Sequence, residues 1–269
     1  MNASVRTASV LLREDLDHIA VLTLNRPDAR NSLSEALIAA LTNTLRSIAD
    51  DRTVRVVVLA ANGLGFCAGH DMKEMTARRS DADRGRAYFK QLMDACSTMM
   101  QTIVHLPKPV IAAVQGAASA AGCQLVASCD LAIASSAAKF ATPGVNIGLF
   151  CSTPVVALSR NVSRKHAMEM LLTGDLISAE DAQRIGLINR AVAPGTERDE
   201  ALKLARQIAS KSALTVKIGK EAFYRQLEMS LADAYSYASD VMVENMLARD
   251  AEEGIGAFIE KRAPNWADR

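Results

Sequence analysis

Hydrophobic and polar residues form blocks along the chain, and their periodicity switches between strand-like and helix-like. Short apolar runs rich in β-branched residues predict strands, because such runs suit a buried, pleated surface. These runs are Val10–Leu12, His18–Leu24, Val54–Ala60, Pro109–Val114, Leu131–Ser135 and Leu187–Val192, and Lys139–Ala141 is expected to form a further short strand. The polar segment Glu14–Asp17 joins the first two and predicts a hairpin turn.

Between these runs, apolar residues recur three and four positions apart, which is typical of amphipathic helices. Three of the expected helices begin at a capping pair, in which an early hydroxyl accepts a hydrogen bond from the first turn. The pairs are Ser32 with Glu35, Ser80 with Asp83, and Ser178 with Asp181. Helices are expected from Ser32 to about Asp50, from about Asp83 to Ile103, from Gly122 to about Cys129, from Thr153, from Ser178 to Gly186, and at Glu197–Ser210, Ala213–Gln226, Leu231–Asn245 and Asp250–Lys261.

The order of these elements predicts an α/β protein with a helical extension. Strands and helices alternate over residues 1–196, whereas residues 197–269 contain only helical patterns. The mostly apolar segment Ala234–Leu247 would expose a stripe on a monomer, so we expect it to pack against another copy of the chain.

The segment Val114–Ser135 contains the most unusual pattern in the chain. After Gly116 come six small residues, Ala117 to Gly122, and then a helix starts. Small side chains allow close approach of a ligand or of another backbone. The first turn of a helix leaves backbone N–H groups unpaired, and these attract negative charge. This segment is therefore a candidate site for stabilising an oxyanion.

Composition and charge exclude several classes of function. The 269 residues are 49% hydrophobic and 23% charged, and 31 basic against 30 acidic side chains give a net charge of +1. Such a balance offers no strong field for nucleic acid, and an aromatic content of 4% offers few stacking platforms. No apolar run approaches the roughly 20 residues of a membrane span. We therefore expect neither a nucleic-acid nor a membrane partner.

The N-terminal stretch Met1–Asp15 lacks the apolar region of a signal peptide, which predicts an uncleaved cytoplasmic start. The five cysteines contain no CxxC pair and indicate buried, reduced thiols. The four histidines are scattered, so no metal site is expected. The Gly63–Gly69 loop follows a strand, but its glycine spacing departs from a dinucleotide fingerprint.

Several separate, ordered motifs resemble the crotonase, or enoyl-CoA hydratase/isomerase, superfamily. The resemblance is carried by Leu24–Leu33 (LNRPDARNSL), Phe66–Met75 (FCAGHDMKEM), Gln115–Ser135, Phe140–Pro154 (FATPGVNIGLFCSTP), Leu171–Ile188 and Phe258–Arg262 (FIEKR). It implies a crotonase fold of repeated β-β-α units, with a CoA site in residues 1–196 and a C-terminal trimerisation region in residues 197–269.

The resemblance also implies roles for individual residues. The backbone N–H groups of Ala68 and Ala121 align with two donors that hold a thioester oxygen, and simple helix packing is the alternative for Ala121. No cofactor is implied beyond the CoA moiety of the substrate. The positions implied for CoA binding are Arg30, Ala68, His70, Asp71, Met72, Phe258 and Lys261. Of these, Phe258 and Lys261 match residues that reach the CoA of a neighbouring subunit, and Arg30 pairs with a phosphate unless it is a solvated loop arginine.

Two positions depart from the family pattern. Hydratases of this family use one glutamate in the buried helix and one in the second loop, and here these positions hold Gln124 and Gly144. Paired carboxylates deliver water across a double bond, one as base and one as acid. An amide and a glycine cannot take these roles, so we expect standard hydration to be weak or absent. Weak substitutes are His70, Asn146, Cys151 and Ser152.

The sequence thus predicts a protein of fatty-acid metabolism that binds an acyl-CoA or enoyl-CoA thioester, nominally an enoyl-CoA hydratase-type lyase. Three alternatives stay open: another thioester reaction such as hydrolysis or decarboxylation, non-catalytic binding of acyl-CoA, and a structural subunit. A homotrimer or homohexamer is expected. The expected location is cytoplasmic, with the mitochondrial matrix as the alternative.

Overall fold

The computed structural model describes residues 9–269, in which the strands form two sheets. Residues 1–8 of the expected uncleaved start lie outside that range. The larger sheet has the order β1-β2-β3-β5-β7-β10, with an antiparallel first pair and parallel neighbours thereafter. Its strands are β1 (Leu11–Leu16), β2 (Ile19–Leu24), β3 (Val56–Ala61), β5 (Val110–Val114), β7 (Leu131–Ser135) and β10 (Arg190–Val192).

The smaller sheet has the order β4-β6-β8-β9, and its first three strands are parallel. Its strands are β4 (Gly65–Cys67), β6 (Ala117–Ser119), β8 (Lys139–Ala141) and β9 (Ile177–Ser178). The strands that lie next to each other here are far apart in the sequence. Their carboxyl ends meet at one edge, which is where ligands bind in parallel sheets.

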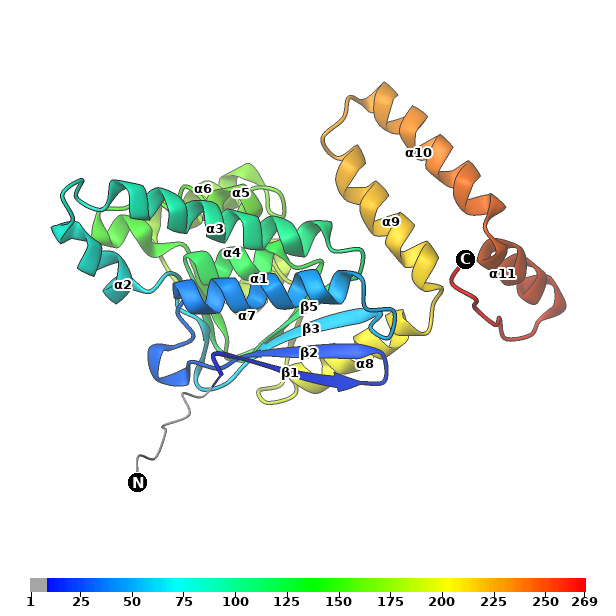
Figure 1. Cartoon of the computed structure of the whole chain (residues 1–269), viewed down its shortest axis with the longest axis horizontal. Helices are drawn as coiled ribbons and strands as arrows, with labels where there is room; N and C mark the ends of the chain where they lie inside the picture. The colour runs from blue at the N-terminus through cyan, green and yellow to red at the C-terminus, as the bar shows by residue number, and fades with distance from the viewer. Residues whose placement is uncertain (1–8) are drawn as a thin grey trace.

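Helices cover both faces of the larger sheet (Figure 1). Side chains alternate along β3: Val57 and Leu59 join the core beneath α1 and α3, while Val56 and Val58 join the core beneath α8. Strand β3 is therefore covered on both faces. The helices are α1 (Glu35–Ala49), α2 (Met72–Ala77), α3 (Arg86–His105), α4 (Ala121–Ser128), α5 (Pro154–Leu158), α6 (Arg164–Thr173), α7 (Ala179–Arg184), α8 (Glu197–Ala209), α9 (Ala213–Gln226), α10 (Leu231–Leu247) and α11 (Arg249–Glu260), with short 3-10 turns at Pro27–Ala29, Arg78–Ser80 and Pro143–Ile147.

The first hairpin is longer than predicted. Strand β1 continues to Leu16, so the expected turn at Glu14–Asp17 is wrong. The turn consists of Asp17 and His18, whose φ angles of 46° and 68° are left-handed. Two left-handed residues match the twist of a tight hairpin, and Asp tolerates this conformation.

Two of the three predicted helix starts move. Ser34, not Ser32, caps α1 by accepting a hydrogen bond from the N–H of Leu37. Helix α3 begins after the left-handed Gly85, and Asp83 instead accepts hydrogen bonds from Gly85 and Ala87. The third is confirmed, because the Ser178 hydroxyl caps α7.

The last three helices stand away from the sheets (Figure 1). Helix α8 packs on the larger sheet through Ala201, Leu202 and Ala205, although the expected boundary at residue 197 places it outside the core. Helices α9 and α10 bury no residue completely. We name α9, α10 and α11 the C-terminal arm. Its exposed large apolar side chains are Phe223, Leu227, Leu231, Tyr235, Met242, Val243, Met246, Leu247, Ile255, Phe258 and Ile259.

Candidate functional site

The candidate site lies at the carboxyl edge of the smaller sheet, where β4, β6 and β8 end. Helix α4 starts directly after β6 and approaches β4 so closely that only glycine fits at position 122. A Cβ on Gly122 would overlap the carbonyl oxygen of Cys67 and lie 2.7 Å from its carbonyl carbon. The small residues predicted to allow close approach therefore let the backbone of α4 pack directly against the backbone of β4.

Ala120 holds the start of α4 in an unusual conformation. Its φ of 50° and ψ of −117° fall in a region that glycine prefers. The Ala120 N–H donates to the carbonyl of Ala141 at 2.9 Å, which ties α4 to β8. Among residues 9–269 the next N–H, that of Ala121, has no hydrogen-bond partner. The predicted donor at Ala121 is thus available for a ligand.

The other predicted donor, Ala68, is engaged. Its N–H donates to the carbonyl of Arg30 at 3.1 Å, contrary to the expectation that it holds a thioester oxygen. Leu33 and His70 form an isolated parallel bridge, and the N–H of His70 has no acceptor within the described part of the chain. Gly69 brings this segment against α4, since a Cβ there would lie 3.4 Å from the Ala121 nitrogen. His70 and Ala121 therefore each offer a free N–H group at this edge.

The side chain of His70 is largely enclosed. Its Nε2 atom is buried and has no hydrogen-bond partner among the described residues. Burial lowers the pKa of the imidazole below its usual value, because the charged form loses solvation. A neutral imidazole at physiological pH follows.

The two positions of the family glutamates are both buried. Gln124 is 5% exposed, and its Oε1 has no partner in the described range. Gly144 lies in the 3-10 turn Pro143–Ile147, and a Cβ there would lie 2.6 Å from the Leu149 oxygen and 2.9 Å from the Cys151 sulfur. A longer side chain at Gly144 therefore requires this loop to move.

The other candidates in this loop have different surroundings. Asn146 is exposed, and its Nδ2 donates weakly to Gly174 at 3.5 Å. Ser152 is also exposed and contacts the carbonyl of Phe150. Cys151 is buried, and burial raises the pKa of its thiol. A raised pKa disfavours the thiolate that a nucleophile requires. All five cysteines are free and buried, which confirms their predicted state.

Polar residues that the sequence analysis missed hold the loops of the site. Arg26 pairs with Asp71 at 2.9 Å, and Asp71 also caps α2 by accepting from the Lys73 N–H at 3.1 Å. Burial alone would raise the pKa of Asp71, but the hydrogen bonds from Arg26 and from backbone N–H groups outweigh it and lower the pKa. The fully buried Asn31 donates to the carbonyls of Asn62 and Gly65. Both Arg26 and Asn31 lie in the polar segment between β2 and α1, and this segment was the sequence signal that could have identified them.

The predicted CoA contacts lie in two separate places. Arg30 and Met72 are exposed beside the candidate site, and within residues 9–269 the Arg30 guanidinium makes no ion pair. Phe258 and Lys261 lie at the end of α11, on the C-terminal arm, and Phe258 is 84% exposed. The fold thus does not bring these two residues to the site of the same chain.

The comparisons with known proteins identify the family of this chain. The family model described as "Enoyl-CoA hydratase/isomerase" matches residues 14–269. This chain belongs to that family. The superfamily resemblance of the motifs and the crotonase fold are thereby confirmed.

Individual members of the enoyl-CoA hydratase/isomerase family match over most of the chain. Human enoyl-CoA hydratase domain-containing protein 3, mitochondrial, is 47% identical over 252 residues, covering 94% of this chain and 82% of the relative. The crystal structure of that human protein has a TM-score of 0.91 at 46% identity and covers 96% of this chain and all of the other. A Mycobacterium smegmatis enoyl-CoA hydratase structure also has a TM-score of 0.91, at 51% identity, covering 96% of this chain and 98% of that one. The chain as a whole is thus similar to enoyl-CoA hydratase domain-containing protein 3.

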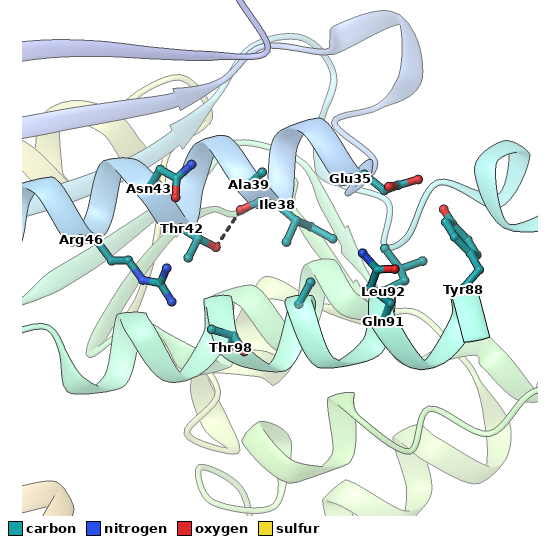
Figure 2. Close-up of a pocket in the computed structure, with 11 residues that line it drawn as sticks. Glu35, Ile38, Ala39, Thr42, Asn43, Arg46, Tyr88, Gln91, Leu92 and Thr98 are labelled. Carbon is teal, nitrogen blue, oxygen red and sulfur yellow. Dashed lines mark hydrogen bonds between the residues drawn. The ribbon is translucent and has the colours of Figure 1, made fainter. Parts of the chain in front are cut away.

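A hollow of about 360 Å³ lies elsewhere in this family member, between α1 and α3 (Figure 2). Glu35 and Arg46 lie on its α1 side, and Tyr88 and Thr98 lie on its α3 side. None of the predicted site residues lines it, so it is separate from the candidate site.

In the described range, no group of three or more His, Cys, Asp or Glu residues is placed to hold a metal, and no helix has the length and apolarity to cross a membrane.

Proposed function

We propose that this enoyl-CoA hydratase/isomerase-family chain binds acyl-CoA or enoyl-CoA thioesters and polarises their carbonyl group, with no cofactor beyond CoA. The observation that supports this is the pair of unpartnered backbone N–H groups at His70 and Ala121. Two donors that face one oxygen stabilise its negative charge, and removing one typically costs about 3 kcal/mol in a transition state. The exposed Arg30 is the proposed partner of a CoA phosphate.

Hydration of a double bond is proposed to be weak or absent. Gln124 can donate and accept hydrogen bonds but cannot remove a proton from water, and Gly144 offers no acid. His70 remains a weak candidate, and its lowered pKa favours a base over an acid. Decarboxylation needs no base at the α-carbon, so stabilisation of an enolate by the two N–H groups supports it as an alternative reaction.

A calorimetric titration tests this function. The purified protein is titrated with crotonyl-CoA, acetoacetyl-CoA and free CoA, while the absorbance of the crotonyl double bond is followed in parallel. We expect both thioesters to bind more tightly than free CoA, with no loss of absorbance. Equal binding of all three ligands would contradict carbonyl recognition, and rapid loss of absorbance would contradict the loss of hydration.

We further propose that the C-terminal arm joins three copies of the chain, as a trimer or as a dimer of trimers. Its exposed apolar side chains would otherwise face water, which disfavours a monomer. In such an assembly Phe258 and Lys261 reach the CoA of a neighbouring subunit. Sedimentation of the wild type and of Met246→Glu checks this: a trimer or hexamer that dissociates in the variant is expected, and a monomeric wild type would contradict it.

The proposed compartment follows the relatives. The domain-containing protein 3 sequences from human, rat and zebrafish all carry "mitochondrial" in their names, which supports the matrix alternative and not the cytoplasmic prediction. Fractionation of cells that express the tagged full chain would distinguish the two.

A further inference from the structure

The chain turns back along α11 after that helix ends (Figure 1). Lys261 has a left-handed φ of 56°, and its N–H donates to the carbonyl of Phe258. The N–H of the next residue, Arg262, donates to the carbonyl of Ala257 at 3.0 Å. This is the Schellman arrangement, which ends a helix and reverses the chain. We name residues 263–269 the return segment, because they run back toward the start of α11.

The return segment is fastened to α11 along its length. The carboxylate of Glu253 accepts a hydrogen bond from the N–H of Asn265 at 2.7 Å. The carboxylate of Asp250, which is 2% exposed, accepts from the N–H groups of Ala267 and Asp268 at 2.8 and 3.0 Å. A buried carboxylate is costly unless hydrogen bonds compensate its lost solvation. The return segment therefore forms part of the packed structure of α11.

Two side chains of the return segment reach the junction between α8 and α9. The indole N–H of Trp266 donates to the carbonyl of Ser210 at 2.9 Å. The indole ring lies against α11, since a Cβ on Gly254 would be 3.1 Å from it. The carboxylate of Asp268 accepts from the N–H of Ala213, the first residue of α9, at 2.8 Å. These contacts join α11 to the junction.

Arg55, which directly precedes β3, completes the contact from the core. Its guanidinium pairs with Asp268 at 2.6 Å and donates to the carbonyl of Ala209, the last residue of α8, at 3.0 Å. A cation at the carboxyl end of a helix is favourable. One guanidinium thus connects the larger sheet, α8 and the return segment. We name the contacts that Arg55, Trp266 and Asp268 make here the clasp.

Helix α9 has an anchor of its own, whereas α11 depends on the clasp. Lys220 and Tyr224 of α9 both donate to the Asp130 carboxylate, at 2.7 and 2.9 Å. Helix α10 then leads away from the sheets, and within residues 9–269 it buries no residue completely (Figure 1). A single residue, Ala248, connects α10 to α11. The clasp therefore fixes the place to which α11 returns.

We propose that the clasp positions α11 so that Phe258 and Lys261 contact the CoA of a neighbouring subunit. These two residues lie at the end of α11, directly before the return segment, and Phe258 is 84% exposed in the single chain. A helix that is already held in place loses less conformational freedom when it binds a ligand. The residues of the clasp act through α11 and are positioning residues. This inference rests on the proposed binding of CoA and on the proposed assembly.

The fluorescence of Trp266 tests the clasp itself, because Trp266 is the only tryptophan in the sequence. Arg55→Met removes the guanidinium and retains an unbranched side chain. We expect the emission maximum to shift to longer wavelength and quenching by acrylamide to increase, since the indole becomes more accessible to water. The matched control is Arg184→Met, which removes an exposed arginine paired with Asp181 at 2.9 Å in α7 and should change neither signal. Unchanged fluorescence in Arg55→Met would overturn the clasp.

Calorimetric titration with free CoA and crotonyl-CoA tests the positioning role. When the clasp is lost, CoA binding must supply the free energy of the missing contact, which is worth a factor of about two to ten. Arg55→Met and Asp268→Ala should therefore each bind both ligands about two- to tenfold more weakly. The ratio of the two affinities should stay that of the wild type, because the candidate site is unchanged. A folding defect would instead lower the number of binding sites per chain.

A combined variant shows whether the clasp acts through α11. In a chain that carries Phe258→Ala and Lys261→Ala, adding Arg55→Met should change the affinity for free CoA by less than about twofold. Changes that act through the same contact are not additive, whereas independent changes add. A full two- to tenfold effect of Arg55→Met in this background would overturn the positioning role.

The outcomes separate this inference from the proposed function. Wild-type affinity for CoA in Arg55→Met, together with altered fluorescence, would overturn the positioning role and leave CoA binding intact. No binding of free CoA or crotonyl-CoA by the wild type would overturn both.

Discussion

Replacing Gly122 by alanine should separate the two backbone donors of the site. The new Cβ would overlap the Cys67 carbonyl oxygen and lie 2.7 Å from its carbon and 2.9 Å from its Cβ. Carbon atoms pack best about 3.5–4.0 Å apart, so α4 must move away from β4 by about 1 Å. A hydrogen bond of 2.9 Å lengthened by that amount is lost. The Ala121 N–H moves with α4, whereas His70 stays with β4.

This displacement predicts two measurable effects. Overpacking of this kind costs about 1–3 kcal/mol of unfolding free energy, and loss of one hydrogen bond weakens thioester binding about two- to tenfold. Urea unfolding and calorimetric titration with butyryl-CoA measure them. Gly219→Ala, in helix α9, is the matched control, because a Cβ there meets no atom within 4 Å. A folded Gly122→Ala protein with wild-type thioester affinity would refute the two-donor geometry.

Three further changes test other parts of the structure. Ala120→Gly should raise the unfolding free energy by about 1 kcal/mol, because it relieves the left-handed strain; a lower melting temperature would contradict this. Because the pKa of His70 is lowered in the folded state, the unfolded state binds more protons just below pH 6.5. The free energy of unfolding should therefore fall as the pH drops through that range. His70→Gln should reduce this pH dependence, as measured by urea unfolding at a series of pH values. The side chain of Lys220 is 6% exposed and donates to Asp130 at 2.7 Å, so Lys220→Met should cost about 3–5 kcal/mol in unfolding measurements, and a loss below 1 kcal/mol would show that the buried pair is dispensable.

The sequence patterns predicted the buried strands of the larger sheet and, of the four short strands of the smaller sheet, only β8. The runs at β2, β3, β5 and β7 are long enough to show their apolar character, and the structure confirms them. By contrast, β4 and β9 have three and two residues, so no period can be seen in them. Their pairing depends on contacts between segments that are distant in sequence. The smaller sheet, which carries the site, was therefore the least predictable part.

The sequence predicted the small-residue segment at the start of α4 correctly. It placed the second backbone donor two residues too early. The small residues after Gly116 correctly indicated a close approach and a free N–H at Ala121. The second donor moved from Ala68 to His70, because a loop pattern does not show which N–H is already used by a neighbouring carbonyl.

The two departures from the hydratase pattern, Gln124 and Gly144, differ in how much the structure must change to accept a glutamate. Gln124→Glu replaces an amide by a carboxylate of nearly equal size. Gly144→Glu introduces a Cβ 2.6 Å from the Leu149 oxygen, in a turn closed by the hydrogen bond from the Leu149 N–H to the Gly144 carbonyl at 2.9 Å. That substitution must open the turn before a carboxylate can reach the substrate. An inactive double variant with both glutamates restored would therefore not show why hydration is absent. Its inactivity could result from the displaced loop at position 144 and not from the catalytic groups. Gln124→Glu alone keeps the loop, and its effect on thioester binding reports the charge at that position directly.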